Sequence, residues 1–114
     1  MRVIHNVLGT VYEVFLGKRE EIGVDECNAG ECRIYSKQIK VCTDRDDCTE
    51  EELKAKIREI LAHEVFHAYI NEAGIDLDDQ VEELLATFFM KNWKKMFNSV
   101  TELIEKAEKV DLTE

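Results

Sequence analysis

A ten-residue segment, 60–69, constrains this chain more than any other, because it holds two histidines four residues apart with a glutamate between them. On an α-helix His63 and His67 project from the same face, with their bases roughly 6 Å apart. Glu64 lies about 100° around the helix from His63. Every other position of the segment is uncharged, unlike a solvated surface helix. The pattern therefore predicts a partly buried helix whose polar side chains are concentrated at one point.

This His-Glu-x-x-His spacing is typical of a metal site. Two imidazoles on one helical face can supply two ligands of a tetrahedral zinc ion. Glu64 is close enough to reach a water on that ion without being a ligand, as a general base requires. The alternative is a metal-free helical partner protein in which the histidines coincide by chance, and the uncharged flanks favour the metal site over it.

The motif and its surroundings resemble a known family. The segment 63–68, followed by an acidic loop and by Val-Glu-Glu-Leu at 81–84, resembles the small zincin-like metallopeptidases of phage and prophage genomes. The strand-forming front half and helical back half are similar as well, although only residues 49–93 carry specific motifs. The resemblance implies a zinc hydrolase that acts on peptide bonds. With the element pattern, it implies an α+β fold: a small N-terminal antiparallel sheet packed on an antiparallel pair of long helices, plus a C-terminal helix.

The third zinc ligand has two main candidates on the second of those helices. With Val81 set at zero, the apolar stripe of that helix centres near 40°, Glu82 falls near 100° and Glu83 near 200°. Glu82 therefore flanks the expected buried face, and the resemblance also points to it. Asp78 and Asp79 remain open as further alternatives.

The expected site thus holds zinc through His63, His67 and Glu82, with Glu64 as the catalytic base that activates water. Zinc and one further donor would stabilise the oxyanion, and three candidates for that donor stay open: Tyr35, Tyr69 or a backbone N–H. The alternative function is a zinc-stabilised, non-catalytic protein-interaction module. Removal of the metal would unfold such a module, whereas a catalytic zinc site usually permits a folded metal-free form.

The length of the chain limits the shape of the expected site, and its charge limits the kinds of molecule it can bind. A chain of 114 residues forms one domain, 1–114, too small for a two-lobed cleft, so the site should be shallow. The net charge of −10 disfavours nucleic acid and anionic membranes as partners. No apolar run is long enough to span a bilayer and no secretory signal is apparent. We expect a cytoplasmic protein whose partner is a peptide or protein substrate.

Four cysteines lie within one 22-residue window, at positions 27, 32, 42 and 48. Their C-x4-C-x9-C-x5-C spacing lacks the C-x2-C pairs of common structural zinc sites. In a reducing compartment we expect free, partly buried thiols, while a second zinc site or a disulfide stays open.

The front half predicts strands. Residues 10–16 are expected to form a strand, although a short helix fits the same residues. Residues 31–35 and 38–42 are expected to form two strands joined around Ser36 and Lys37. One of these two is a candidate for an exposed edge strand that would hold an extended substrate near the metal helix. The acidic segment 43–48 lacks the glycine and glutamate positions of a calcium loop, so it is expected to be a solvated turn.

The back half predicts helices. A capping box at 49–52 should start a helix that runs to Ala73, with Gly74 in the left-handed conformation. A second helix should begin near Asp78 and run to about Phe97. A second capping box, 99–102, should open a last helix that covers the core. His5, isolated from the motif, is expected to be structural or exposed.

Overall fold

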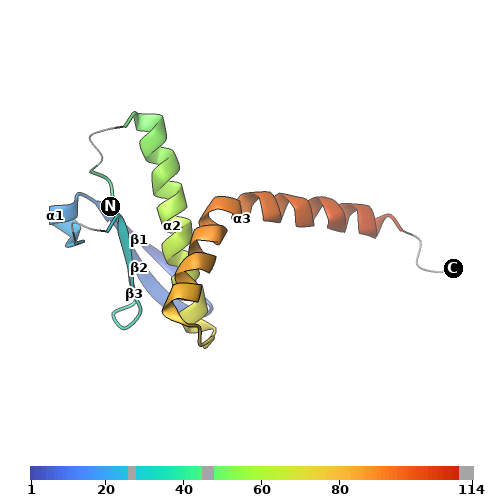
Figure 1. Ribbon diagram of the computed structural model, residues 1–114, viewed down its shortest axis with the longest axis horizontal. Helices are drawn as coiled ribbons and strands as arrows, with labels where there is room; N and C mark the ends of the chain where they lie inside the picture. Colours follow the sequence, from blue (N-terminus) through green and yellow to red (C-terminus); the bar gives the residue numbers. More distant parts are fainter. Residues whose placement is uncertain (26–27, 45–47, 111–114) are drawn as a thin grey trace.

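The computed structural model describes residues 1–25, 28–44 and 48–110, so Cys27 and part of the acidic segment 43–48 lie outside the described residues. A four-stranded sheet is packed against one of two long helices (Figure 1). The elements in chain order are β1 (Arg2–Val7), β2 (Thr10–Gly17), α1 (Arg19–Ile22), β3 (Gly30–Arg33), β4 (Gln38–Cys42), α2 (Glu50–Glu72) and α3 (Asp79–Glu108). The α+β expectation and the three expected strands are confirmed, although β3 ends at Arg33 rather than at Tyr35. Strand β1 and the short α1 are additional.

The sheet has the order β1-β2-β4-β3 and is mixed. Two antiparallel hairpins, β1 with β2 and β3 with β4, meet where β2 and β4 run parallel. The expected purely antiparallel sheet is therefore wrong at this pair. The physical reason is that the chain crosses over through α1 and β3 before β4 returns beside β2, and a parallel pair requires such a crossover. As a result β3 lies at one edge of the sheet.

The core lies between one face of the sheet and α2. Alternation along β4 buries Ile39 and Val41, and Tyr12 and Val14 of β2 are buried beside them. Ala68 of α2 is fully buried against this layer. Six partly buried apolar side chains pack against this core: Leu16, Cys32, Ile57, Ile60, Leu61 and Val65.

Local capping fixes where α2 and α3 begin. Thr49 precedes α2 and its hydroxyl accepts a hydrogen bond from the Glu52 amide at 3.2 Å, which confirms the predicted start. Gly74 follows α2 with a φ of 69°, the predicted left-handed conformation. Asp78 then caps α3 by accepting from the Gln80 amide at 2.9 Å.

Helix α3 is one continuous element of 30 residues. The expected end near Phe97 and the separate last helix from Ser99 are both wrong. Ser99 and Glu102 form a capping-box pattern, but no glycine or proline nearby breaks the helical run. Figure 1 shows that the first turns of α3 lie against α2, after which the helix bends and leaves the rest of the structure. No helix among the described residues combines the length and apolar character needed to cross a bilayer.

Strand β3 approaches α2 closely because Gly30 has no side chain. A Cβ built at Gly30 would lie 2.6 Å from Ile60 Cγ2 and 2.9 Å from the Lys40 carbonyl oxygen. Any larger residue would force the strand and the helix apart. The glycine therefore sets how near this edge strand lies to the histidine helix.

The far end of α2 is fastened to the sheet by one carboxylate. Glu72 accepts hydrogen bonds from Lys37 Nζ at 2.7 Å, and from the Thr10 and Tyr12 hydroxyls at 2.8 Å each. These bonds, that from Lys37 first, lower the pKa of Glu72 to about 2. The ionised carboxylate thus joins the last turn of α2 to β2 and to the residue that precedes β4.

We expect Glu72→Gln to lower the melting temperature at pH 7, because the neutral amide cannot match three bonds to a charged acceptor. A carboxyl whose folded pKa is depressed stabilises the fold above its unfolded pKa, and this contribution fades as the pH falls. The difference between wild type and variant should therefore shrink between pH 5 and pH 2. Circular dichroism melts would measure it. Glu59→Gln, which alters an exposed carboxylate paired with Lys91, is the control and should change little.

Candidate metal centre

Helix α2 brings the two motif histidines together. The Nε2 atoms of His63 and His67 are 3.2 Å apart, and the ring centroids are 4.9 Å apart. Both side chains are largely buried, with 18% and 12% exposed. The four-residue spacing has therefore produced the shared face that the sequence predicts.

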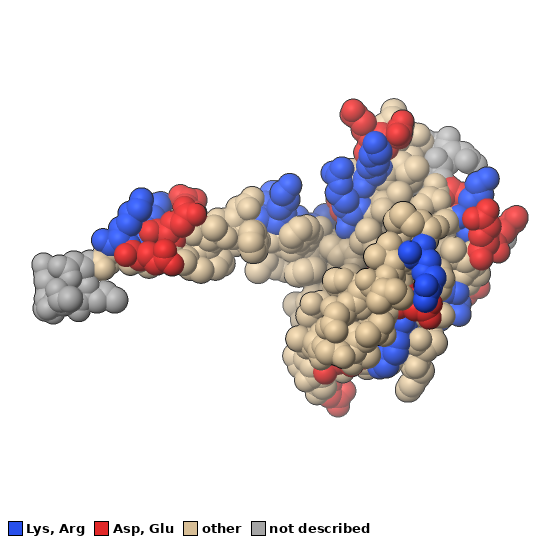
Figure 2. Space-filling model, turned by 180° about the vertical axis from the view of Figure 1, so that it is seen from behind, with Lys and Arg blue, Asp and Glu red and all other residues tan. Residues whose placement is uncertain are grey.

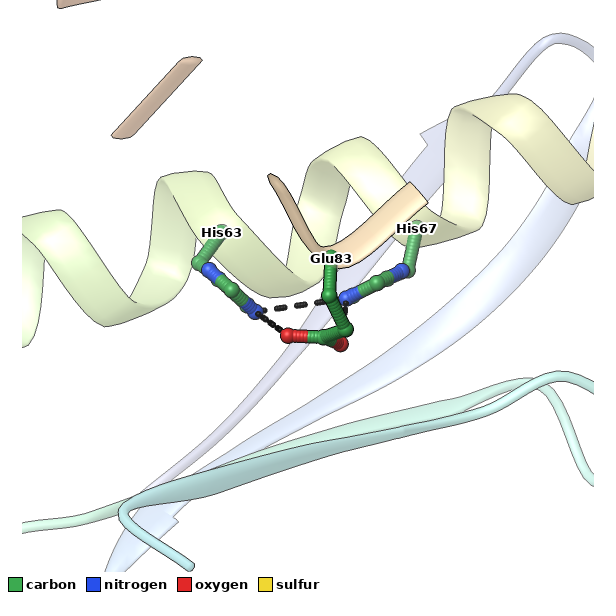
Figure 3. Close-up of side chains that lie close together, drawn as sticks. All are labelled: His63, His67 and Glu83. Atoms are coloured by element: carbon green, nitrogen blue, oxygen red, sulfur yellow. Dashed lines mark hydrogen bonds and ion pairs between the residues drawn. The ribbon is translucent and has the colours of Figure 1, made fainter. Parts of the chain in front are cut away.

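The carboxylate of Glu83, from α3, closes this group (Figure 3). Its Oε2 lies 3.2 Å from His63 Nε2 and its Oε1 lies 2.7 Å from His67 Nε2. One ligand atom from each of the three residues lies within 4.8 Å of the others. Among the described residues, no other group of three histidine, cysteine or acidic side chains meets this criterion.

Glu82 lies on the other side of His67. Its Oε2 is 2.5 Å from His67 Nδ1, so this ring nitrogen donates to Glu82. The tautomer assigned from this contact leaves Nε2 of His67 with its lone pair directed toward His63 and Glu83. Glu82 is the carboxylate expected from the sequence, but the structure places Glu83 against both Nε2 atoms and Glu82 against Nδ1 of His67.

The face of α3 that contacts α2 explains why Glu83, rather than Glu82, lies against both Nε2 atoms. Ala86 is the fully buried residue of α3, whereas Leu84 and Phe88 of the expected stripe are more than half exposed. Ala86 lies about 140° from Val81 on a helical wheel, roughly 100° from the expected centre. Glu82 and Glu83 precede Ala86 by four and three residues, so they straddle the real contact line. Both carboxylates consequently reach the histidines.

The donor set fits zinc. Two ligand atoms on a tetrahedral zinc at 2.0–2.1 Å are separated by about 3.3 Å, close to the two 3.2 Å distances between His63 Nε2 and its neighbours. Burial lowers the pKa of His63, which favours the neutral imidazole that metals bind. Two nitrogen lone pairs and a carboxylate would repel one another here unless protons or a cation lay between them.

Glu64 is buried beside this group, with 6% of its surface exposed. Its Cγ would lie 3.4 Å from a Cβ at Gly30, so the side chain is enclosed between α2 and β3. Burial raises the pKa of Glu64 to about 7, and the negative charges of Glu83 and Glu31 add to the effect while His67 opposes it. A carboxyl poised between its two protonation states near neutral pH is suited to moving a proton.

A pocket of about 480 Å³ opens over the centre, between β3 and the two long helices. Its lining residues are Asn28, Gly30, Glu31, Cys32, Arg33, Ile34, Glu64, His67, Asp79, Glu82 and Glu83. Asp79, an alternative ligand from sequence, lines the pocket, whereas Asp78 caps α3. The candidate oxyanion donors Tyr35 and Tyr69 are not among the lining residues, and Tyr35 is 96% exposed.

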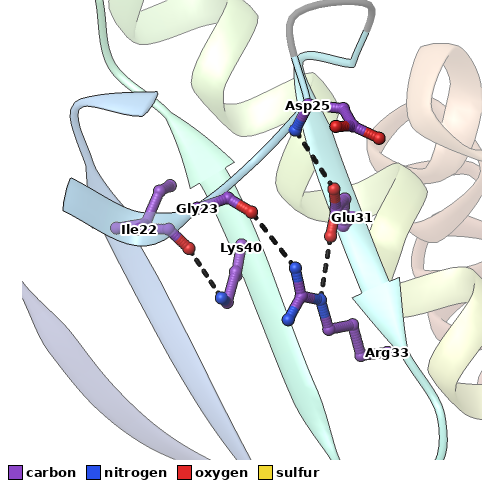
Figure 4. A network of polar contacts seen from close by, with 6 residues as sticks. All are labelled: Ile22, Gly23, Asp25, Glu31, Arg33 and Lys40. Atoms are coloured by element: carbon purple, nitrogen blue, oxygen red, sulfur yellow. Dashed lines mark hydrogen bonds and ion pairs between the residues drawn. The ribbon is translucent and has the colours of Figure 1, made fainter. Parts of the chain in front are cut away.

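Sequence reasoning did not single out Glu31 and Arg33, which line the pocket from β3. Their only sequence signal is the two-residue spacing that puts them on one side of a strand. Arg33 donates to Glu31 at 2.9 Å and to the Gly23 carbonyl at 3.1 Å, and Lys40 donates to the Ile22 carbonyl at 2.6 Å (Figure 4). These bonds tie the segment after α1 to β3 and β4, which fixes the pocket wall.

Cys32 also lines the pocket and is a free thiol. Burial raises its pKa to about 12, so it stays protonated at neutral pH and is a poor nucleophile. Cys42 is buried in β4. The expectation for Cys27 falls outside the described residues.

No protein-family model matches the chain, and no solved structure matches it significantly.

We expect Glu64→Gln to stabilise the metal-free protein at pH 8 but not at pH 5. A carboxyl with a raised folded pKa contributes its full stability below the unfolded pKa of about 4.5, and loses it as the pH rises through about 7. The neutral amide does not titrate, so the variant should gain up to about 3 kcal/mol over wild type across this window. Urea unfolding with a chelator at both pH values measures the difference, and parallel pH profiles would contradict the expectation.

Proposed function

We propose that this protein is a zinc-dependent metallopeptidase, with His63, His67 and Glu83 holding the ion and Glu64 acting as the general base. The observation that carries the proposal is the position of the Glu83 carboxylate across both Nε2 atoms of a His-Glu-x-x-His helix. Glu83 comes from a different helix, so this convergence does not follow from the spacing of the motif alone. The proposal includes the zincin-like architecture, with α2 and the first part of α3 as its antiparallel helix pair.

A zinc ion held by His63, His67 and Glu83 would supply Lewis-acid chemistry: it would polarise a peptide carbonyl and lower the pKa of a water molecule. Glu64, enclosed beside the ligands, would take a proton from the attacking water and pass it to the amine that leaves when the C–N bond breaks. Glu82 would hold His67 in the tautomer that directs Nε2 inward. Hydrolysis thus consumes one water and yields one carboxylate and one amine.

Strand β3 is suited to hold the peptide substrate. Ala29 accepts a hydrogen bond from the Cys42 amide at 2.9 Å, and hydrogen-bonding direction alternates along an antiparallel strand. The main-chain groups of Glu31 and Arg33 therefore face β4, whereas those of Gly30 and Cys32 face the open edge. An extended peptide could add there as a fifth strand, with its carbonyl next to the pocket.

The two glutamates should differ in their effect on zinc affinity. We expect Glu83→Ala to weaken zinc binding by more than about 100-fold, because it removes a ligand, and Glu82→Ala to weaken it about 10- to 100-fold, because it removes the partner that orients His67. Competition with a chromophoric chelator measures both. A larger loss for Glu82→Ala would assign the ligand role to Glu82, as the sequence expectation has it.

Hydrolysis should depend on Glu64. We expect Glu64→Gln to retain one zinc per chain while cleavage of a quenched-fluorescence peptide library falls about 10²- to 10⁴-fold. Glu59→Gln, on the same helix but outside the pocket lining, is the matched control and should remain active. Equal cleavage by wild type and Glu64→Gln would exclude the proposed base.

The alternative, a zinc-stabilised interaction module, is supported by the fact that the ion would join α2 to α3. A chelator separates the two functions. Wild type that unfolds cooperatively when zinc is removed, and that cleaves no peptide when zinc is present, would favour the module. A folded metal-free form that regains hydrolysis with zinc would favour the peptidase.

A further inference from the structure

The C-terminal part of α3 and the residues after it, 93–110, form an arm that touches little else. Every residue of the arm is exposed. The protein measures 63 × 35 × 28 Å and its radius of gyration is 17.1 Å, compared with about 13 Å for a compact domain of this length. Just before the arm, Asn92 Nδ2 donates to the Phe88 carbonyl at 3.0 Å. Figure 1 shows that the later part of α3 points away from α2 and the sheet.

The arm carries an apolar seam that continues the seam used inside the fold. Starting from buried Ala86, apolar residues alternate at spacings of three and four: Ala86, Phe89, Trp93, Met96, Val100, Leu103, Ala107 and Val110. The first two pack against α2, where the Phe66 and Phe89 rings lie 5.4 Å apart. Phe97 and Ile104 widen the seam. This period is that of a helix packed lengthwise against another helix.

The exposed apolar residues of the seam are contiguous, unlike the single apolar residues that are common on protein surfaces. Seven large apolar side chains of the arm are each at least 43% exposed: Trp93, Met96, Phe97, Val100, Leu103, Ile104 and Val110. The helical part of this stripe, residues 93–108, is about 24 Å long at a rise of 1.5 Å per residue. A contiguous stripe of this kind marks an interaction surface.

We propose that the arm pairs antiparallel with the arm of a second copy of this chain. The seam is complementary to itself in that direction, because it sets Trp93 opposite Val110, Met96 opposite Ala107 and Val100 opposite Leu103 of the other copy. Large side chains then meet smaller ones within the arm itself. The contact places the two sheets at opposite ends of the pair.

Charge favours the same partner and the same direction. Residues 91–100 carry three lysines and no acidic residue, +3, whereas residues 101–110 carry three glutamates and two lysines, −1. Antiparallel pairing brings the basic half onto the acidic half, while parallel pairing brings +3 onto +3. Figure 2 shows the acidic side chains of the arm gathered toward its tip. The whole segment 91–110 is +2 and the rest of the chain is −12, so two copies repel least at their arms.

Sedimentation of the full chain tests the proposal. We expect wild type to reach twice its mass of 13.2 kDa as its concentration rises from about 1 to 100 µM. Val100→Glu should raise the dimer dissociation constant about tenfold or more, because it places a charge in the middle of the seam. Thr101→Glu adds the same charge at the next residue, off the seam, and should leave dimerisation unchanged. Both positions are exposed in the single chain, so circular dichroism should show intact folding.

The proposal would be overturned by a wild-type chain that stays monomeric at about 100 µM, which is also the result expected if the seam binds a different protein. Equal losses of dimer affinity from Val100→Glu and Thr101→Glu would overturn it as well.

An exchange of charges tests the direction of pairing. Changing Lys94 and Lys95 to Glu should weaken the antiparallel dimer, and adding Glu102→Lys, Glu105→Lys and Glu108→Lys to the same chain should restore it. A parallel dimer would not be restored, because like charges would still face each other.

Discussion

The close contact between α2 and the first turns of α3 governs the candidate centre. Ala86 is small enough to be fully buried there, and the rings of Phe66 and Phe89 pack nearby. With the two helices this close, the residues three and four positions before Ala86 reach the histidines from both sides. A larger residue at position 86 would move both carboxylates away from the imidazoles. The arrangement of the candidate centre therefore depends on a contact between apolar side chains.

Another side of α2 is fixed by the sheet. Gly30 allows β3 to lie directly against the helix, and Glu72 binds the last turn to β2. Glu64 faces this packed side, and its burial follows from the same close approach that brings the edge strand beside the histidines. The raised pKa of Glu64 is thus a consequence of how near β3 lies to α2, and burying this carboxyl in its charged form costs stability that the neighbouring core offsets.

The same spacing of apolar residues runs through both the packed first turns of helix α3 and its exposed arm. Its first turns use the seam to pack on α2, and the arm presents the same seam without an internal partner. Isolated helices of this length owe most of their stability to packing of an apolar face. In the proposed dimer, the arm of a second copy would bury the part of the seam that α2 does not cover.

The sequence determined the local features of this protein, because these depend on neighbours within one turn or one strand. The cap at Thr49, the left-handed Gly74, the strand Gln38–Cys42 and the shared face of His63 and His67 were all readable from residue type and spacing. The start of α3 at Asp78 was readable for the same reason.

Only the tertiary structure decided the parallel pairing of β2 with β4, the length of α3 and which of Glu82 and Glu83 lies against both histidine Nε2 atoms. The wheel of α3 placed its most apolar stripe toward the core, but α2 packs on Ala86 instead, because the closest helix approach follows the smallest side chain rather than the most apolar sector. The face of α3 that contacts α2 is therefore rotated by roughly 100° from the expected face, which brings Glu83 as well as Glu82 to the histidines. Such a rotation is set by the surface of the other helix, which the local sequence of α3 does not contain.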